Sequence, residues 1–191
     1  MRNRLLRPAI SLLVAMTLLL GVAYPLLVTG LARLAFAQAA GGSLIYRNGV
    51  LVGSSLIGQQ FSDPTHLWGR PSATPPQPYN ALGSTGSNLG PLNPALIDQV
   101  KTAAKALKGA DPANGAPIPV DLVTASASGL DPDVSVSAAR YQLARLARVR
   151  GLVPAQLEAL MQAHEQRPLL GFIGERRVNV LEFNLALDGL R

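Results

Sequence analysis

The feature that most constrains this chain is an uncharged, mostly apolar run over residues 8–32. Its 25 residues include no Asp, Glu, Lys, Arg or His, and as one helix the run would be roughly 37 Å long. A bilayer core about 30 Å thick needs only about 20 apolar residues. The run therefore predicts a transmembrane helix, either tilted or bent at Pro25.

The arginines around this run predict its orientation. Arg2, Arg4 and Arg7 precede it, and few basic residues follow it closely. Because cytoplasmic flanks carry the excess of Lys and Arg, the N-terminus should be cytoplasmic. We therefore predict a cytoplasmic segment at 1–7, a transmembrane helix at 8–32 and an extracytoplasmic domain at 33–191.

A cleaved signal peptide is the rival interpretation of the same residues. The triplet Ala35-Phe36-Ala37 has the A-x-A form of a cleavage site, which would give a mature N-terminus at Gln38. Signal peptides, however, usually have an apolar region of about 7–15 residues, well short of this run. The length favours a retained anchor, and both interpretations export the remainder.

Charge and composition narrow the function of that remainder. The chain carries a formal charge of +6, but Arg2, Arg4, Arg7 and Arg33 flank the apolar run, so 13 basic residues face 11 acidic ones from Gln38 onward. Without a basic tract or an aromatic platform, nucleic acid is not an expected partner. Cysteine is absent, which excludes thiol catalysis and Cys-based zinc sites.

Local patterns predict an α+β domain with three or four helices and a few short strands. Asn48-Gly49 between two apolar runs indicates a β-hairpin. Helical periodicity and capping residues indicate helices at about 94–108, 135–150, 154–166 and 180–187, and the segments 169–173 and 178–180 could be strands. Gly109 and Gly151 should end the first two helices, and Arg145 should lie on the polar side of the second.

Catalytic and ligand-binding patterns are weak. His66 and His164 lie far apart and outside any metal-binding pattern. Ser126 and Ser128 lack the surroundings of a nucleophile elbow, and small residues there favour close packing with local backbone hydrogen bonds. The segment from Asp131 imitates a calcium loop only at its start, and the Gly-rich segment 83–90 has no lysine directly after it, as a phosphate-binding loop requires.

Several short strings along the chain, taken in order, resemble a known family. They are Gly58-Gln59-Gln60-Phe61, Arg70-Pro71-Ser72-Ala73, Tyr79-Asn80, Gly86-Ser87-Asn88-Leu89-Gly90-Pro91, Asn93-Pro94, Val123-Thr124-Ala125-Ser126, Ser128-Gly129-Leu130-Asp131-Pro132, Arg150-Gly151 and Val178-Asn179-Val180-Leu181 with Asn184. As a set, they resemble the C-subunit (KdpC) family of bacterial Kdp potassium-transporting ATPases. The resemblance runs from the anchor to the C-terminus.

The resemblance implies a non-catalytic accessory subunit of an ATP-driven, high-affinity potassium uptake system in the bacterial inner membrane. Its implied partners are a channel-like K⁺-translocating subunit, a P-type ATPase subunit and a small single-helix subunit, with lipid around the anchor. The family is described as a catalytic chaperone that raises the ATP affinity of the ATPase subunit. Because ATP is cytoplasmic and this domain is predicted to be external, that effect should be indirect.

We expect no catalytic, cofactor-binding or metal-binding residues in this chain, with K⁺ handled by partner subunits. Candidate interface or structural residues come from the motif strings, since polar groups in compact loops need partners once buried. Two other functions stay open at this point: a membrane-anchored extracytoplasmic serine hydrolase and a secreted binding module. The candidate residues are Gln59, Arg70, Ser72, Asn88, Asn93, Thr124, Ser126, Ser128, Asp131 and Asn179.

Overall fold

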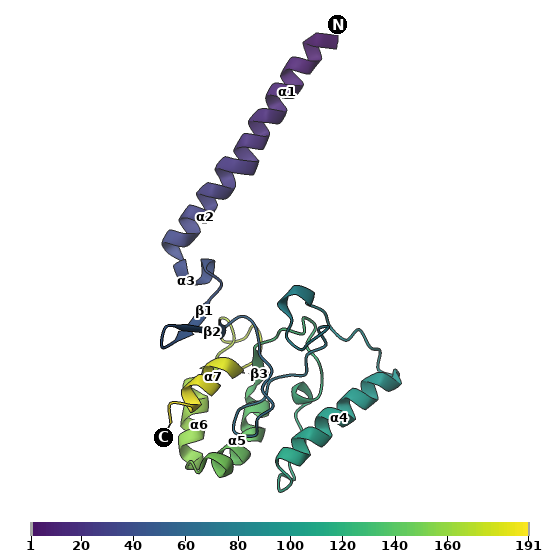
Figure 1. Ribbon diagram of the computed structural model, residues 1–191, viewed down its shortest axis with the longest axis vertical. Coiled ribbons are helices and arrows are strands. Elements are labelled where there is room, and N and C mark those ends of the chain that lie inside the picture. Colours follow the sequence, from purple (N-terminus) through teal and green to yellow (C-terminus); the bar gives the residue numbers. More distant parts are fainter. Residues whose placement is uncertain (1, 191) are drawn as a thin grey trace. The chain divides into compact units, whose positions relative to one another are not determined.

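The computed structural model describes residues 2–190 and divides them into two compact units, with the boundary between Val52 and Gly53 (Figure 1). The first unit holds a long apolar helix, a short helix and most of a β-hairpin. The second, the folded unit, holds the remaining helices and a small sheet. The prediction of an apolar N-terminal helix followed by a mixed helix and strand domain is confirmed.

The apolar helix is continuous but not uniform. Its membrane-length part covers Leu5–Ala35, and an 18-residue stretch of it has a mean hydropathy of 2.2 and no burial within the protein. One turn of π-helix separates two α-helical parts, and Pro25 lies just after it. Proline lacks an N–H and its ring crowds the carbonyl four residues earlier, so a widened turn accommodates it without breaking the helix. The three parts are α1 (Arg2–Leu18), η1 (Leu19–Ala23) and α2 (Tyr24–Ala35).

A short helix and the predicted hairpin follow. Asn48 and Gly49 both have positive φ, 53° and 78°, as the two central residues of a type I′ turn require. The Asn-Gly signal therefore gives the hairpin where it was predicted. These elements are α3 (Ala37–Ala40), β1 (Leu44–Arg47) and β2 (Val50–Ser54).

Four α-helices of the folded unit begin and end close to the predicted positions. Asn93, Ser135 and Asn179 each cap a helix by accepting a hydrogen bond from a backbone N–H in its first turn. Gly151 takes the left-handed conformation that ends the second helix. The helices are α4 (Pro94–Ala110), α5 (Val136–Arg150), α6 (Pro154–Ala163) and α7 (Val180–Leu187), with 3-10 turns at η2 (Ala81–Gly83) and η3 (Val120–Leu122).

Three details differ from the prediction. Gly109 lies inside α4, which continues to Ala110. Helix α6 ends at Ala163, three residues early, because the next residues pair in a sheet. The segment 169–173 is a turn closed by a single bridge between Leu169 and Ile173, and not a strand.

The sheet of the folded unit has the order β3–β5–β4, with both neighbouring pairs antiparallel. Its central strand is paired on both sides, and Val178 at its middle is fully buried. That strand runs directly into α7, so 178–180 is part strand and part helix start. The strands are β3 (Asp133–Ser135), β4 (Glu165–Gln166) and β5 (Arg177–Asn179).

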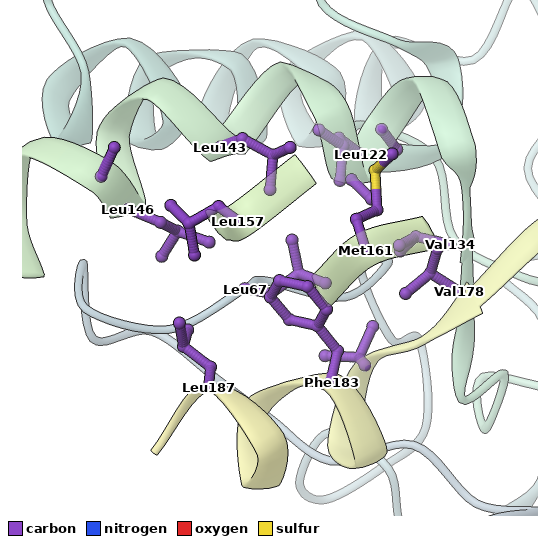
Figure 2. Close-up of a cluster of buried hydrophobic side chains, with 14 of the residues drawn as sticks. Leu67, Leu122, Val134, Leu143, Leu146, Leu157, Met161, Val178, Phe183 and Leu187 are labelled. Atoms are coloured by element: carbon purple, nitrogen blue, oxygen red, sulfur yellow. The ribbon is translucent and has the colours of Figure 1, made fainter. Parts of the chain in front are cut away.

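The hydrophobic core gathers side chains from α5, α6, α7, the small sheet and the loop at residue 67 (Figure 2). Phe183 of α7 points toward Leu67, with Leu157 and Met161 of α6 on the opposite side, and all four are fully buried. Burial on this scale stabilises by about 1.5–3 kcal/mol for each large side chain.

Arg145 is also buried, which corrects its predicted place on the polar side of α5. Its guanidinium donates to the carbonyls of Pro64 and His66 and lies 4.9 Å from the ring centre of Trp68. Burial lowers its pKa to about 10. The loop that contains Pro64 and His66, far away in the sequence, thus covers a residue that helical periodicity places at the surface.

Candidate functional site

Several of the motif strings meet in one group of loops, here called the motif-loop cluster (residues 70–74, 79–86 and 123–133). Arg70 and Asp131 join two of these loops, with 3.1 Å between Nη1 and Oδ2. The same guanidinium donates from Nη2 to the carbonyl of Ala125 at 3.3 Å. One arginine therefore fixes both ends of the segment 125–131 against the loop that begins at residue 70.

Ser72 and Tyr79 tie a second layer of the cluster. The Ser72 hydroxyl donates to the Gly129 carbonyl at 2.7 Å and accepts from the Tyr79 amide at 2.8 Å. The Tyr79 hydroxyl in turn donates to the Arg70 carbonyl at 2.6 Å. Burial raises the pKa of Tyr79 to about 12, with a further contribution from the Asp131 carboxylate. Tyr79 is therefore a neutral hydrogen-bond donor at physiological pH.

Two glycines allow the backbones in the cluster to approach closely. Gly129 has φ of +66°, and a Cβ there would lie 2.6 Å from Thr74 Cγ2 and 2.7 Å from the Thr85 carbonyl. A Cβ on Gly86 would lie 2.9 Å from the Ala127 carbonyl. Glycine at both positions is therefore a packing requirement, and the conformation of Gly129 adds a second one.

The serines and the threonine of the 123–132 segment make local backbone hydrogen bonds. Ser126 accepts from the Gly129 amide at 2.9 Å, and Ser128 accepts from the Leu130 amide at 3.1 Å. Thr124 donates to the Val120 carbonyl at 2.8 Å. These bonds shape turns, in agreement with the packing role that the sequence favours for the two serines.

Asn179 links the sheet to the start of the folded unit. Its amide nitrogen donates to the Ser55 carbonyl at 2.9 Å and to Asp133 Oδ1 at 3.3 Å, while its oxygen caps α7. The Gln59 side chain lies where a Cβ on Gly53 would fall. Both candidates therefore act where the chain enters the folded unit.

The other two candidates, Asn88 and Asn93, act on the local backbone. Asn88 has φ of 52°, a left-handed turn position that asparagine tolerates better than most residues. Asn93 caps α4, with its side chain 2.9 Å from the Ala95 amide. Asn88 therefore supports a turn, and Asn93 supports the start of a helix.

A polar cavity of about 350 Å³ opens beside the Arg70–Asp131 pair. Asp133 lines it and pairs with Arg177 at 2.7 Å. Burial raises the pKa of Asp133, and the nearby Asp131 carboxylate adds to this, while Arg177 opposes it. Among the described residues, no group of three His, Cys, Asp or Glu side chains could hold a metal ion. Two ion pairs, Arg70–Asp131 and Arg177–Asp133, lie among the residues that line this cavity, which suits a structural network.

Two cluster residues are absent from the sequence-based candidates. Thr74 is buried, donates to the Gln77 carbonyl at 2.7 Å and accepts from the Asn80 amide at 2.9 Å. Tyr79 closes the loop as described above. The proline-rich string that precedes Tyr79 was the available signal, since a segment with few N–H groups depends on side chains to hold its shape.

Over the described residues, the chain combines one helix that is long and apolar enough to cross a membrane with a folded unit built on interlocked loops. The family model described as "K+-transporting ATPase, c chain" matches residues 6–189. The chain therefore belongs to the KdpC family. It is 62% identical to a potassium-transporting ATPase KdpC subunit of Variovorax paradoxus, over 97% of this chain and 96% of that one. It is also 62% identical to the subunit of Polaromonas naphthalenivorans (100% and 97%) and 60% to that of Dechloromonas aromatica (97% of each).

Proposed function

We propose that this chain is the accessory C subunit of an ATP-driven potassium uptake pump. The observation that carries the proposal is the family match over residues 6–189, because it includes the apolar helix as well as the folded unit. The named relatives, which are also covered over nearly their whole length, are subunits of potassium-transporting ATPases. A subunit of this kind contributes to assembly and regulation, and the partner subunits carry out ATP hydrolysis and K⁺ translocation.

Assembly is the direct test. The chain would be co-expressed with the candidate channel-like subunit, P-type ATPase subunit and small single-helix subunit, and the complex purified in mild detergent. We expect the chain in stoichiometric amounts and K⁺-stimulated ATPase activity that falls when the chain is left out. A complex that forms and transports K⁺ equally well without this chain would refute the proposal.

The proposed topology has a cytoplasmic N-terminus and an extracytoplasmic folded unit. It rests on the arginines that precede the apolar run, of which Arg7 is nearest. Because the chain has no cysteine, Asn3→Cys and Lys105→Cys can each be labelled alone with a membrane-impermeant maleimide in spheroplasts. We expect labelling at Lys105→Cys at once and at Asn3→Cys only after permeabilisation. The intact mass tests cleavage, which would leave Gln38 at the N-terminus.

The finer role is an indirect increase of the ATPase subunit's affinity for ATP. In the proposed topology ATP and the folded unit lie on opposite sides of the membrane, so the effect must be a coupling between sites. Such coupling requires that the chain bind two conformational states of the pump with different affinity. The ATP concentration for half-maximal ATPase activity should therefore rise several-fold without the chain, and a photoreactive ATP analogue should not label it. Labelling within the folded unit would contradict the indirect mechanism.

A further inference from the structure

The connection between β4 and β5 displays a cluster of large apolar side chains. Leu169, Leu170, Phe172 and Ile173 are 68%, 76%, 76% and 50% exposed. These four residues, here called the apolar tip, fall within five consecutive positions. Single exposed apolar residues are common in soluble domains, but a contiguous group that includes an aromatic ring marks an interaction surface.

The apolar tip is an ordered turn. Leu169 and Ile173 exchange two backbone hydrogen bonds, of 3.0 and 2.9 Å. Leu170 and Gly171 take positive φ values of 54° and 83° to complete the turn. At its base, Glu165 forms an ion pair with Arg176 beside the paired strands β4 and β5. A side chain held on such a support loses little conformational entropy when it binds, which favours recognition.

The charges around the apolar tip distinguish between a protein and a lipid surface. The flanking residues carry both signs: Glu175, Arg167, Arg176 and Arg177 are exposed, and the Glu165 side chain, only 6% exposed, lies beneath Arg176 as its ion-pair partner. Two of the three arginines form ion pairs within the folded unit, with Glu165 and Asp133. A membrane-binding surface pairs its apolar side chains with an excess of unneutralised Lys and Arg. An apolar centre with a nearly neutral, mixed-sign rim is instead the anatomy of a protein interface.

We propose that the apolar tip inserts into an apolar pocket on the extracytoplasmic surface of another subunit of the pump. This rests on the proposed function, which supplies the partner and places the folded unit outside. The pocket should accept one leucine and one phenylalanine side chain and have a polar rim that carries both signs. Buried aromatic anchors of this kind provide most of the affinity in many interfaces.

The apolar tip is also connected to the motif-loop cluster through strand β5. Arg177, four residues after the tip, pairs with Asp133. Asn179, two residues further, bonds to both Asp133 and the Ser55 carbonyl. An attachment at the tip would therefore fix the orientation of the cluster relative to the partner subunit, which gives the folded unit a second connection to the pump besides the apolar helix.

The first experiment removes the anchors without touching the core. The double variant Leu170→Ser/Phe172→Ser would be compared with Leu92→Ser/Val153→Ser, whose side chains are 93% and 58% exposed and lie outside both the tip and the motif-loop cluster. Full-length chains would be added to detergent-purified pump that lacks this subunit, and their affinity measured. We expect the tip variant to bind at least tenfold more weakly, with an unchanged unfolding midpoint, and the control to bind as wild type does. Equal affinity for both variants would overturn the proposal.

A second experiment identifies what covers the apolar tip. Phe172→Cys, in a chain with no other cysteine, would carry an environment-sensitive fluorophore in full-length protein reconstituted into vesicles of phosphatidylethanolamine and phosphatidylglycerol. We expect a blue shift only when the other subunits are present. A shift in vesicles alone would indicate lipid, a shift that depends on the density of this chain would indicate a second copy, and no shift would indicate an exposed loop; each overturns the proposal. If wild-type protein fails to assemble, the proposed function has failed instead.

Discussion

The core of the folded unit and its motif-loop cluster are held together by different physics. The core packs apolar side chains of α5, α6 and α7 around Phe183, and many residues of similar volume would fill the same space. The cluster depends on individual polar atoms and on the absence of side chains at Gly86 and Gly129. In the core, the stability that a substitution costs should therefore follow the side-chain volume that it removes. In the cluster, the cost should depend on which residue is replaced.

The largest effect is expected from Phe183→Ala, which opens a cavity in the core. The ring is fully buried, so its removal should cost about 3–5 kcal/mol of unfolding free energy. The lone tryptophan, Trp68, lies in the folded unit and reports its unfolding in urea with the full chain in mild detergent. Leu157→Met, which conserves volume at another fully buried position, is the control and should cost less than about 1.5 kcal/mol. Equal losses would contradict the volume-graded core.

The cluster is tested by a matched pair of glycines. Gly129 and Gly151 have the same φ of +66°, but only at Gly129 would a Cβ meet other atoms within 4 Å. Gly151→Ala should cost about 1 kcal/mol for its backbone conformation alone. Gly129→Ala should cost about 2–4 kcal/mol, because its new Cβ also displaces the neighbouring atoms of Thr74 and Thr85. Similar values for the two variants in urea unfolding would show that close packing at Gly129 contributes nothing.

The same contrast explains what the sequence could predict. The hairpin at Asn48-Gly49, the Asn93 cap and the Gly151 stop depend on neighbours within a few residues, and all three are confirmed. Arg145 was misplaced because its partners, Pro64 and His66, lie about eighty residues earlier. The order of the sheet was also out of reach, because strands of two or three residues carry no pattern of their own.

The candidate residues show the same limit. Arg70 and Asp131 were selected from motif strings, yet nothing local relates two residues 61 positions apart. Tyr79 belongs to a quoted string but was not chosen, since its role appears only once Ser72 and Arg70 are beside it. Whether any of these positions contacts a partner subunit stays a prediction.

A smaller effect, visible at high pH, is expected from Tyr79. Because its pKa rises from 10.0 to about 12 on folding, its contribution to stability is complete below pH 10 and is lost as the pH rises through 12. Tyr79→Phe should cost about 1 kcal/mol at pH 8, through the lost bond to the Arg70 carbonyl. It should also make the unfolding free energy fall less steeply between pH 10 and 12, because the slope against pH loses the contribution of up to one proton. Urea unfolding across that range measures the slope, and Tyr46→Phe, an exposed tyrosine of the hairpin, should leave it unchanged.

The smallest effect is expected from Arg140→Ala, at a surface ion pair that looks stronger than the one in the cluster. Arg140 lies 2.6 Å from Glu158, closer than Arg70 to Asp131, but its side chain is 56% exposed against 25% for Arg70. Exposed pairs contribute little because water screens them and the side chains lose entropy, so the loss should stay below about 0.5 kcal/mol. Arg70→Ala should cost more than twice as much, since Oδ2 of the partly buried Asp131 carboxylate and the Ala125 carbonyl both lose the arginine as donor. If urea unfolding ranked the two variants by distance instead, the polar network of the cluster would have no special role in its stability.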